Sequence, residues 1–370
     1  MGCGLLLYHL AQMASTWQPT PLPPTQELET RAVLKKLATA HRALAELKGI
    51  LGTLPDAEIL LHTLPLQEAK DSSAIENIIT THDELFQAAV QANAPVTQAA
   101  KEVQNYAAAL QLGFELIRKH GFLSSNHLVQ VQAELEHNNA GYRRLPGTTL
   151  KNDKTGEVIY TPPQDHATIL DLMSNLEQYL NNDDLSDADP LVKMAILHFQ
   201  FESIHPFYDG NGRTGRILNI LYLVLKGLLD LPVLYLSRFI TQHKADYYHH
   251  LQQVRDTGNW EPWLLYLIAG VEQTAQETIA LINAMRQLMQ QAQQQLRTYR
   301  FYSQDLLYHL FRYPYTRIEF VQQELGVSRL TAGTYLNQLA APGGLLTKYK
   351  LGKSNYYVNQ PLFELLARLG

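Results

Sequence analysis

One stretch of the sequence decides the fold: His205-Pro206-Phe207-Tyr208-Asp209-Gly210-Asn211-Gly212-Arg213-Thr214-Gly215-Arg216. It combines an imidazole, a carboxylate, an amide, glycines and two guanidinium groups. Upstream, Asp189-Pro190 is typical of a helix N-cap followed by proline at the first helical position, which predicts a helix from Leu191 to Ile204. Downstream, apolar residues on nearly every side predict a buried helix from Ile217 to Leu229. The stretch is therefore predicted to be a polar loop that leads directly into a core helix.

The predicted start of the second helix is suited to binding a phosphate. The first N–H groups of a helix have no intrahelical partner, and the macrodipole places positive charge there. Gly210 and Gly212 allow the backbone to approach an anion closely, and Asn211 can donate from its side chain. Because Arg213 and Arg216 are three residues apart, they share one helical face and can clamp two anionic groups together.

Two further residues of the stretch can supply chemistry. Asp209 can hold Mg²⁺ through one oxygen, as is usual for a metal that is shared with phosphates. His205 can accept a proton from an attacking hydroxyl group. Each of these residue types is more often structural when it occurs alone. Their combination at this spacing favours a phosphate-binding site over a capped loop with surface arginines and a satisfied histidine.

The same stretch resembles a known family at every defined position: it matches the Fic (filamentation induced by cAMP) signature, H-x-F-x-[DE]-G-N-G-R-x-x-R. Fic proteins are α-helical, and most of them transfer AMP from ATP to a hydroxyl side chain of a target protein. The resemblance implies that His205 deprotonates the target Ser, Thr or Tyr, that Asp209 binds Mg²⁺ and that Phe207 anchors the loop. The residues that it implies for ATP binding are Glu76, His205, Gly210, Asn211, Gly212, Arg213, Thr214, Gly215, Arg216, Gln242 and Tyr247.

A short motif far upstream matches a second feature of the family. Ser72, Glu76 and Asn77 fit the inhibitory motif [ST]-x-x-x-E-[GN], on a helix predicted over about 66–79. The alternative is an ordinary solvated glutamate. The resemblance implies that Glu76 pairs with Arg216, whose planar fork can take a carboxylate or a phosphate but not both well. ATP would then bind with its α-phosphate badly aligned for attack.

Two more elements of the site are implied by the resemblance. Turn residues at 152–156 and a short strand at 157–161 predict a β-hairpin. In the family this hairpin is a flap that holds the target by strand addition; otherwise it is a structural loop. Gln242 and Tyr247 are the candidates for the wall of the adenine site. For Tyr247 the alternatives are a core position or replacement by Tyr248.

Composition and length bound the remaining possibilities. The chain has 370 residues, of which 46% are hydrophobic and 18% charged, as is typical of a soluble globular protein of two or three domains. Its net charge of −5 argues against bulk nucleic-acid binding. The single cysteine, Cys3, excludes an intrachain disulfide and predicts a reducing, cytoplasmic compartment. No apolar run reaches membrane-spanning length, so no membrane contact is expected.

The fold class expected is mainly α: a Fic-type helical bundle with a small hairpin flap and a C-terminal winged-helix domain. Trp17 opens a proline-rich segment that is either a polyproline ligand or a strap packed onto the core, and similar segments in longer Fic proteins favour the strap. The predicted domains are an N-terminal arm with helices (1–95), the catalytic core (96–299) and the winged helix (300–370). Further helices are predicted at 26–51, 99–120, 126–136, 165–180, 243–256 and 261–299, the last ending in a solvated glutamine-rich connector at 290–295.

The last 71 residues differ from the rest in charge, with +4 against −9. Helices at 317–325 and 329–340, joined by a turn, have helix-turn-helix spacing, and a strand–turn–strand follows at 346–358. This order resembles a winged helix. Winged helices bind DNA or proteins, and both remain open. In the first case the contacts would come from Arg329, Thr331 and Thr334 in a major groove and from Lys348, Lys350 and Lys353 on phosphates.

The function that the sequence favours is a Mg²⁺- and ATP-dependent protein adenylyltransferase that Glu76 restrains. Its expected partners are ATP, an unidentified target protein and the chain itself, with a homodimer among the oligomeric states left open. One alternative is a Fic enzyme that removes AMP or uses another phosphate donor. Another is a DNA-binding regulator with a vestigial Fic domain, against which the intact His205 and Asp209 argue.

Overall fold

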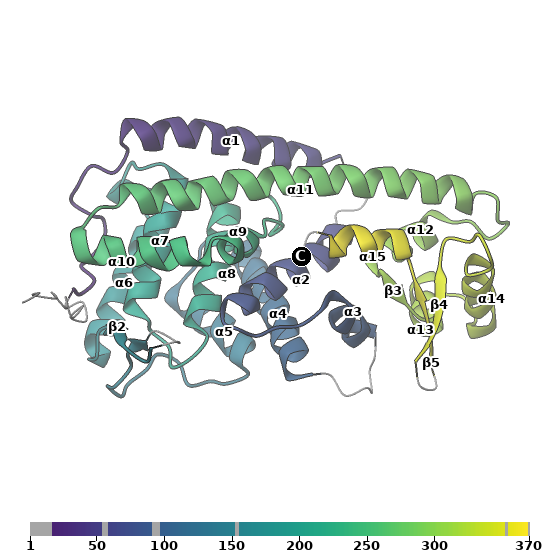
Figure 1. Ribbon diagram of the computed structural model, residues 1–370, viewed down its shortest axis with the longest axis horizontal. Helices are drawn as coiled ribbons and strands as arrows, with labels where there is room; N and C mark the ends of the chain where they lie inside the picture. Colours follow the sequence, from purple (N-terminus) through teal and green to yellow (C-terminus); the bar gives the residue numbers. More distant parts are fainter. Residues whose placement is uncertain (1–16, 54–57, 91–96, 152–154, 352–353, 369–370) are drawn as a thin grey trace, which may run out of the picture.

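The computed structural model describes residues 17–53, 58–90, 97–151, 155–351 and 354–368 (Figure 1). Cys3, the central turn residues 152–154 and Lys353, all used in the predictions above, lie outside them. The described chain is mainly helical, with one two-stranded and one three-stranded sheet. No helix within these ranges is both long and apolar enough to span a bilayer.

The helical core is built around α7 (Pro190–Ile204), in which every residue from Leu191 to Ile204 is buried. The Asp189 carboxylate accepts a hydrogen bond from the Leu191 N–H at 2.8 Å, and proline occupies the first turn, so the predicted helix start is confirmed. Helix α7 packs against α6 (His166–Asn181) and α8 (Asn211–Leu225). Helix α8 packs in turn against α4 (Gln98–His120), α5 (Ser125–Glu136) and α9 (Leu236–Gln242), and α10 (Lys244–Thr257) packs against α9.

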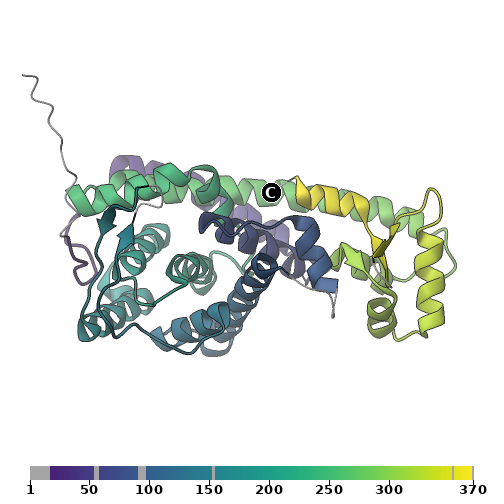
Figure 2. The ribbon, with the colours of Figure 1, turned by 60° about the horizontal axis from the view of Figure 1, so that its bottom comes forward.

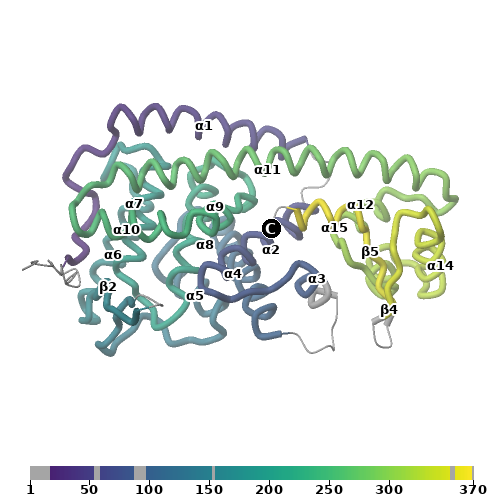
Figure 3. The backbone as a smooth tube through the Cα atoms, viewed as in Figure 1, coloured from purple at the N-terminus to yellow at the C-terminus, as the bar shows by residue number. Residues whose placement is uncertain are grey.

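The longest helix, α11 (Glu261–Leu296), forms a spine along the molecule, and α1 (Arg31–Leu51) packs along it (Figure 3). Helix α1 starts later than predicted because Thr30 caps it and accepts a hydrogen bond from the Val33 N–H. The glutamines at 290–295 form the last turns of α11, as predicted, and they are exposed or half-buried, while Ala292 and Leu296 are buried on the inner face of the helix.

Helix α8 begins at Asn211 and ends at Leu225, so both its ends differ from the prediction of 217–229. At the C-terminal end Gly227 adopts φ 66°, and the Leu228 N–H reaches back to the Leu223 carbonyl at 2.9 Å. This is the glycine-dependent helix stop that leaves Leu228 and Leu229 outside the helix.

The predicted inhibitory helix also has different bounds. Helix α2 (Glu58–Ile75) runs through Pro65, where the sequence predicted its start, and it ends before Glu76. Proline inside a helix removes one backbone hydrogen bond. The buried residues Leu64 and Ala69 anchor the helix on either side of it, because α2 packs against both α4 and α9.

The N-terminal segment confirms the predicted strap over its described part. The Trp17 ring lies 5.5 Å from Phe199 and 6.2 Å from Tyr160, measured between ring centroids. The Asn175 side chain bonds to both the N–H and the carbonyl of Leu22, at 2.7 and 3.0 Å. The segment is thereby fixed to α6 and α7.

The predicted hairpin is present as β1 (Leu150–Lys151) and β2 (Val158–Tyr160), which pair antiparallel with a bulge after Leu150. Tyr160 is buried and donates to the Ser203 carbonyl at 2.8 Å. This bond ties the base of the hairpin to the C-terminal end of α7.

The C-terminal region contains α12 (Gln304–Arg312), β3 (Tyr315–Thr316), α13 (Ile318–Leu325), α14 (Arg329–Leu339), β4 (Thr347–Leu351), β5 (Ser354–Val358) and α15 (Gln360–Ala367). The strands form an antiparallel sheet in the order β3-β5-β4. This is the element order of a winged helix, as predicted, although α12, β3 and α15 were not. Figure 2 shows this region at one end of α11 and the helical core at the other.

A short helix that the sequence analysis did not predict, α3 (His82–Val90), follows the inhibitory motif. Helices α2 and α3 lie between the helical core and the C-terminal region (Figure 1). The inhibitory motif therefore lies in a part of the chain that is placed between the helical core and the C-terminal region.

Candidate active site

The loop from His205 to Gly210 connects α7 to α8 and is closed by one side chain. His205 caps α7 in the left-handed region, at φ 50°. The Asn211 amide accepts from the Phe207 N–H at 2.8 Å and donates to the Phe207 carbonyl at 2.9 Å. Phe207 is buried, as predicted. The Asn211 side chain therefore fixes the loop, where the sequence analysis had it donating to a phosphate.

The space around the start of α8 is too small for a side chain at positions 210 and 212, so both positions require glycine. Gly210, the N-cap, has φ 75°, and a Cβ there would lie 2.4 Å from the Glu136 Oε1. A Cβ on Gly212 would lie 2.4 Å from the Glu76 Oε1. Because the first N–H groups of a helix lack intrahelical partners, this narrow space could accept a small anion, with the Glu136 and Glu76 carboxylates at its edge. Thr214 and Gly215 lie on the buried side of the same turns.

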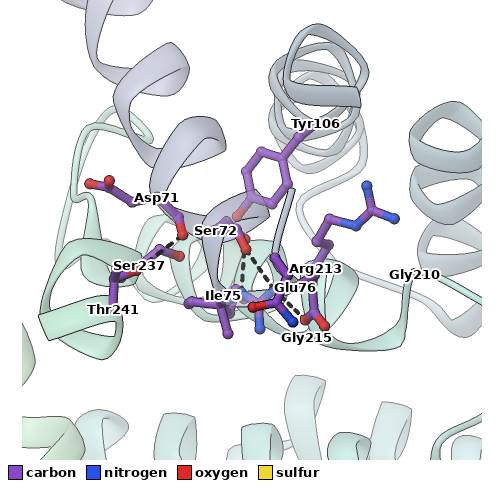
Figure 4. A network of polar contacts seen from close by, with 12 residues as sticks. Asp71, Ser72, Ile75, Glu76, Tyr106, Gly210, Arg213, Gly215, Ser237 and Thr241 are labelled. Carbon is purple, nitrogen blue, oxygen red and sulfur yellow. Dashed lines mark hydrogen bonds and ion pairs between the residues drawn. The ribbon is translucent and has the colours of Figure 1, made fainter. Parts of the chain in front are cut away.

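Arg216 is almost completely buried, with 2% of its surface exposed. Its Nε donates to the Ser72 Oγ at 2.8 Å, and its Nη2 donates to the Ser72 carbonyl at 3.1 Å and to the Glu76 Oε1 at 2.8 Å. Figure 4 shows Ser72 and Glu76 together at the end of α2, next to Tyr106 of α4. The structure therefore contains the ion pair that the motif predicted.

Glu76 remains charged in this contact. Burial raises its pKa, but the charges of Arg216, Arg213 and Lys244 and the hydrogen bond from Arg216 outweigh that effect, so the pKa of Glu76 lies below its ordinary value. A lowered carboxyl pKa stabilises the contact above the ordinary pKa, about 4.5, and the contact is lost as the pH falls below it. A change of pH within the neutral range therefore does not release Glu76.

Arg213 has carboxylate partners that the sequence analysis missed. Its Nη1 lies 3.1 Å from the Glu102 Oε2 and its Nη2 lies 2.8 Å from the Glu136 Oε1. Burial raises the pKa of Glu136, as do the nearby carboxylates of Asp209, Glu102 and Glu76, against the opposite effect of Arg213. No local pattern could identify these partners, because they lie on α4 and α5.

The His205 imidazole is neutral at physiological pH. Burial, followed by the positive charges of Arg143 and Arg255, lowers its pKa to about 4, against the opposite effect of Glu76. Its Nδ1 is buried and has no hydrogen-bond partner among the described residues. A neutral imidazole at physiological pH can accept a proton without first losing one.

Asp209 is exposed at the mouth of the loop, and the Gly210 N–H holds its Oδ1 at 2.7 Å. Within the described ranges no three His, Cys, Asp or Glu side chains form a cluster suited to a metal ion. A single exposed carboxylate beside a phosphate site fits Mg²⁺, which needs few protein ligands when phosphate oxygens and water complete its shell.

The two adenine-wall candidates occupy different environments. Gln242 is exposed at the end of α9. Tyr247 is buried in the core, where its hydroxyl bonds to the His198 Nε2 at 2.8 Å and its ring lies 5.7 Å from Trp263. Tyr247 therefore occupies the core position that the sequence analysis kept as an alternative, whereas its neighbour Tyr248 is 47% exposed.

Asn77 ends the inhibitory segment in the left-handed region, at φ 62°. The Lys244 Nζ donates to the Ile75 carbonyl at 2.6 Å and to the Asn77 Oδ1 at 3.4 Å. These bonds tie the end of α2 to α10, next to the pair that Glu76 makes with Arg216.

The residues predicted to contact DNA are only partly available. The Arg329 guanidinium pairs with Glu319 at 2.6 Å, and the Lys348 Nζ donates to Asn337 at 2.8 Å. Thr331 is half-buried in the first turn of α14, where its N–H donates to the N-cap residue Ser328, whereas Thr334 and Lys350 are exposed. Leu330, between Arg329 and Thr331 in the sequence, is 82% exposed. An apolar side chain therefore stands on the helix that would enter a DNA groove.

Comparison with known proteins covers most of the chain. The model of the Fic/DOC family N-terminal region matches residues 34–115, that of the Fic/DOC family matches residues 122–223, and that of the protein adenylyltransferase SoFic-like C-terminal domain matches residues 285–362. Together they include the inhibitory motif, the signature and the C-terminal sheet.

Curated relatives match over a shorter region. "Protein adenylyltransferase fic-1" of Caenorhabditis briggsae is 31% identical over 113 residues, which is 30% of this chain and 20% of that protein. "Protein adenylyltransferase Fic" of Drosophila erecta is 32% identical over 103 residues, which is 28% of this chain and 19% of that protein. The chain thus matches about a fifth of the length of these relatives.

Solved structures share the fold at lower identity. A Fic family protein from Desulfovibrio desulfuricans G20 has a TM-score of 0.57 at 20% identity, over 91% of this chain and 98% of that one. Fic-1 from Caenorhabditis elegans has a TM-score of 0.52 at 20% identity, over 68% of this chain and 74% of that one. The predicted fold class is confirmed, and from the three matching regions and the shared fold we conclude that the chain belongs to the Fic/DOC family.

Proposed function

We propose that the protein transfers AMP from ATP to a hydroxyl side chain of a target protein. The observation that carries the proposal is the arrangement at the start of α8: a neutral His205, an exposed Asp209 and the buried Arg216 surround one anion site. The names of the curated relatives support the same reaction.

In this reaction the hydroxyl oxygen of the target attacks the α-phosphorus of ATP. The bond between the α-phosphorus and the bridging oxygen to the β-phosphate breaks, and pyrophosphate leaves. The hydroxyl proton goes to His205, whose low pKa keeps it unprotonated beforehand. The N–H groups at the start of α8 and the guanidinium groups of Arg213 and Arg216 orient the phosphates.

Asp209 would hold Mg²⁺ beside the phosphates. The ion, when bound, offsets the negative charge of the triphosphate, which is needed here because Glu76, Glu102 and Glu136 already surround the two arginines. The glycine backbone at positions 210 and 212 keeps this space open.

The hairpin is the proposed docking place for the target. In the described residues its sheet has two strands, so each strand has an outer edge to which an extended segment can add. Backbone pairing fixes the register of that segment with little choice of side chain. Ser, Thr and Tyr remain open as acceptors, and the chain itself is a candidate target.

Glu76 is proposed to restrain the transfer. While its carboxylate occupies the Nη2 of Arg216, the guanidinium cannot orient the end of the triphosphate. We expect ATP to bind the restrained protein in a pose that is poorly aligned for attack.

The substitution Asp209→Asn tests the role of the metal. Transfer of label from ATP labelled on its α-phosphate should need Mg²⁺ and should fall by on the order of 10²-fold in this variant, since metal assistance accounts for several kcal/mol of transition-state stabilisation. Asp171→Asn, the same change at an exposed residue of α6, should leave the rate unchanged. Label that moved from the γ-phosphate instead would contradict AMP transfer.

A further inference from the structure

Arg143 is a buried arginine whose role the proposed mechanism leaves open. It lies in the segment between α5 and β1, and its residue is 0% exposed. None of the carboxylates in the described part of the chain forms an ion pair with it. Burying a charge without a counter-ion is costly unless hydrogen bonds compensate, so the partners of this guanidinium indicate what it is for.

In the described part of the chain, the side-chain hydrogen bonds of Arg143 all go to backbone carbonyls, and two of the three carbonyls lie where α7 meets the loop that begins at His205. Its Nε donates to the His205 carbonyl at 2.8 Å and its Nη2 donates to the Ile204 carbonyl at 3.3 Å. Its backbone N–H donates to the Pro206 carbonyl at 2.8 Å. The guanidinium therefore sits at the negative end of the α7 dipole, where the last carbonyls lack helical partners.

The same guanidinium also holds the hairpin. Its Nη2 donates to the carbonyl of Pro163, which follows β2 in the chain. The ring of His166, at the start of α6, bonds to the Arg143 carbonyl at 2.9 Å. One side chain thus joins the loop that carries the base to the strand that would carry the target.

We propose that Arg143 is a positioning residue that sets His205 against the target segment held by the hairpin. This inference rests on the proposed function. A rigid link of this kind keeps the imidazole nitrogen and the incoming hydroxyl in register, and a misplacement of about 1 Å can cost on the order of 10²-fold in rate. Because the guanidinium touches neither phosphate nor base directly, its loss should affect the chemical step more than ATP binding.

The test uses Arg143→Lys and Arg143→Gln in the full chain carrying Glu76→Gly. Both substitutions remove the planar guanidinium that bonds to the end of α7 and to Pro163 at once. We therefore expect kcat to fall by on the order of 10²-fold while the KM for ATP changes by less than about threefold. Arg144→Gln, a change at the neighbouring exposed arginine, should leave both parameters unchanged. Thermal unfolding shows whether each variant is folded.

The pH profile separates positioning from a general structural defect. Lysine keeps the positive charge near His205, whereas glutamine removes it, leaving Arg255 and Glu76 as the facing charges. The acid limb of kcat, set by the imidazole pKa of about 4, should therefore move to higher pH in Arg143→Gln only. Rates within threefold of the parent, a raised KM for ATP, or an unmoved limb in a folded Arg143→Gln protein would overturn the proposal. An inactive Glu76→Gly parent would instead count against the proposed function.

A second inference comes from a different place, the boundary between the inhibitory segment and the C-terminal region. Helix α2 packs against α12, and the His62 ring lies 5.3 Å from the Tyr313 ring, centroid to centroid. Helix α3 packs against β3, where the Tyr315 hydroxyl donates to the Asp83 carboxylate. Contacts to the C-terminal region therefore flank Glu76 on both sides in the sequence.

The contact between α3 and the C-terminal region also has an apolar part. The Phe86 ring is buried and lies 6.1 Å from Tyr315 and 6.1 Å from Phe363. Between the two contacts, the Glu76 N–H and the Ile78 N–H both donate to the Ser73 carbonyl at 3.0 Å. Helices α2 and α3 are thus each packed against the C-terminal region, and the tight turn that carries Glu76 lies between them. A shift of either helix moves this turn and with it the Glu76 carboxylate.

The geometry points to the C-terminal region as the part of the chain that keeps Glu76 on Arg216, so that loosening its grip on α2 and α3 releases the restraint. This inference also rests on the proposed function. It amounts to a coupling free energy between the contacts of the C-terminal region and the pair of Glu76 with Arg216. Such couplings typically change an equilibrium by a factor of about 5–150.

A double-mutant cycle measures that coupling. Tyr315→Phe removes the bond to Asp83, and Phe86→Ala removes the ring contacts; each should raise AMP transfer at least about fivefold in the otherwise unchanged chain. Neither should raise it further in the Glu76→Gly protein, since the restraint is already absent there. Tyr349→Ala, on the exposed face of the same sheet, is the control. No rise, or an equal rise in both backgrounds, would refute the coupling, whereas an inactive Glu76→Gly protein would refute the proposed function instead.

Discussion

Replacing Glu76 with glycine is expected to raise the rate of AMP transfer by on the order of 10²-fold, the gain that correct alignment of reacting groups can give. The carboxylate holds the Arg216 Nη2 at 2.8 Å, and the same N–H groups are needed to orient the triphosphate. Removing it frees the Nη2 hydrogen that Glu76 occupies, while Ser72 still holds the guanidinium through Nε and through a second bond from Nη2 to its carbonyl. The measurement is incorporation of α-labelled AMP into the protein itself and into a lysate.

A matched pair of substitutions isolates the effect of charge. Glu76→Gln removes the ionic attraction but leaves the backbone of the turn unchanged, so it should raise the rate in the same direction by a smaller factor. Glu46→Gln makes the same change at an exposed position of α1 and should have no effect. If Glu76→Gly labels itself and other proteins no faster than the unchanged chain, Glu76 is not a restraint.

Replacing His205 with alanine should lower transfer by about 10²–10⁴-fold, the usual contribution of a positioned general base. The effect is best measured in the Glu76→Gly protein, where the starting rate is high. ATP binding should be nearly unchanged, because the imidazole contributes its nitrogen to the attacking hydroxyl and not to the phosphates.

The control for this prediction is His249→Ala, at an exposed histidine of α10, which should transfer AMP at the parental rate. Equilibrium binding of ATP separates the loss of a base from the loss of the nucleotide site. Full transfer by His205→Ala would mean that another group takes the proton, and the assignment of the base would be wrong.

The sequence predicted the parts of the fold that local interactions control. Helices α7, α4 and α5 begin within a residue or so of their predicted starts, since capping and apolar periodicity depend on neighbouring residues. Helix α2 was placed wrongly because Pro65 is a strong local stop signal, which burial on α4 and α9 overrides. Strand β3 has two residues and no pattern of its own, and it exists because β5 pairs with it.

The same division applies to the candidate site. The sequence by itself determined which groups gather at the start of α8, because the loop, the glycines and the helix turn are contiguous. Its resemblance to the Fic inhibitory motif indicated Glu76 as the partner of Arg216, and the structure contains that pair. Only the tertiary structure decided that Arg213 bonds to Glu102 and Glu136, 111 and 77 residues away, and that Arg143 bonds to His205 across 62 residues. It also decided that Tyr247 faces the core. Such pairings depend on how the helices pack against one another. Packing depends on the whole buried surface, which residues from many parts of the chain form together, so no single stretch of sequence can reveal it.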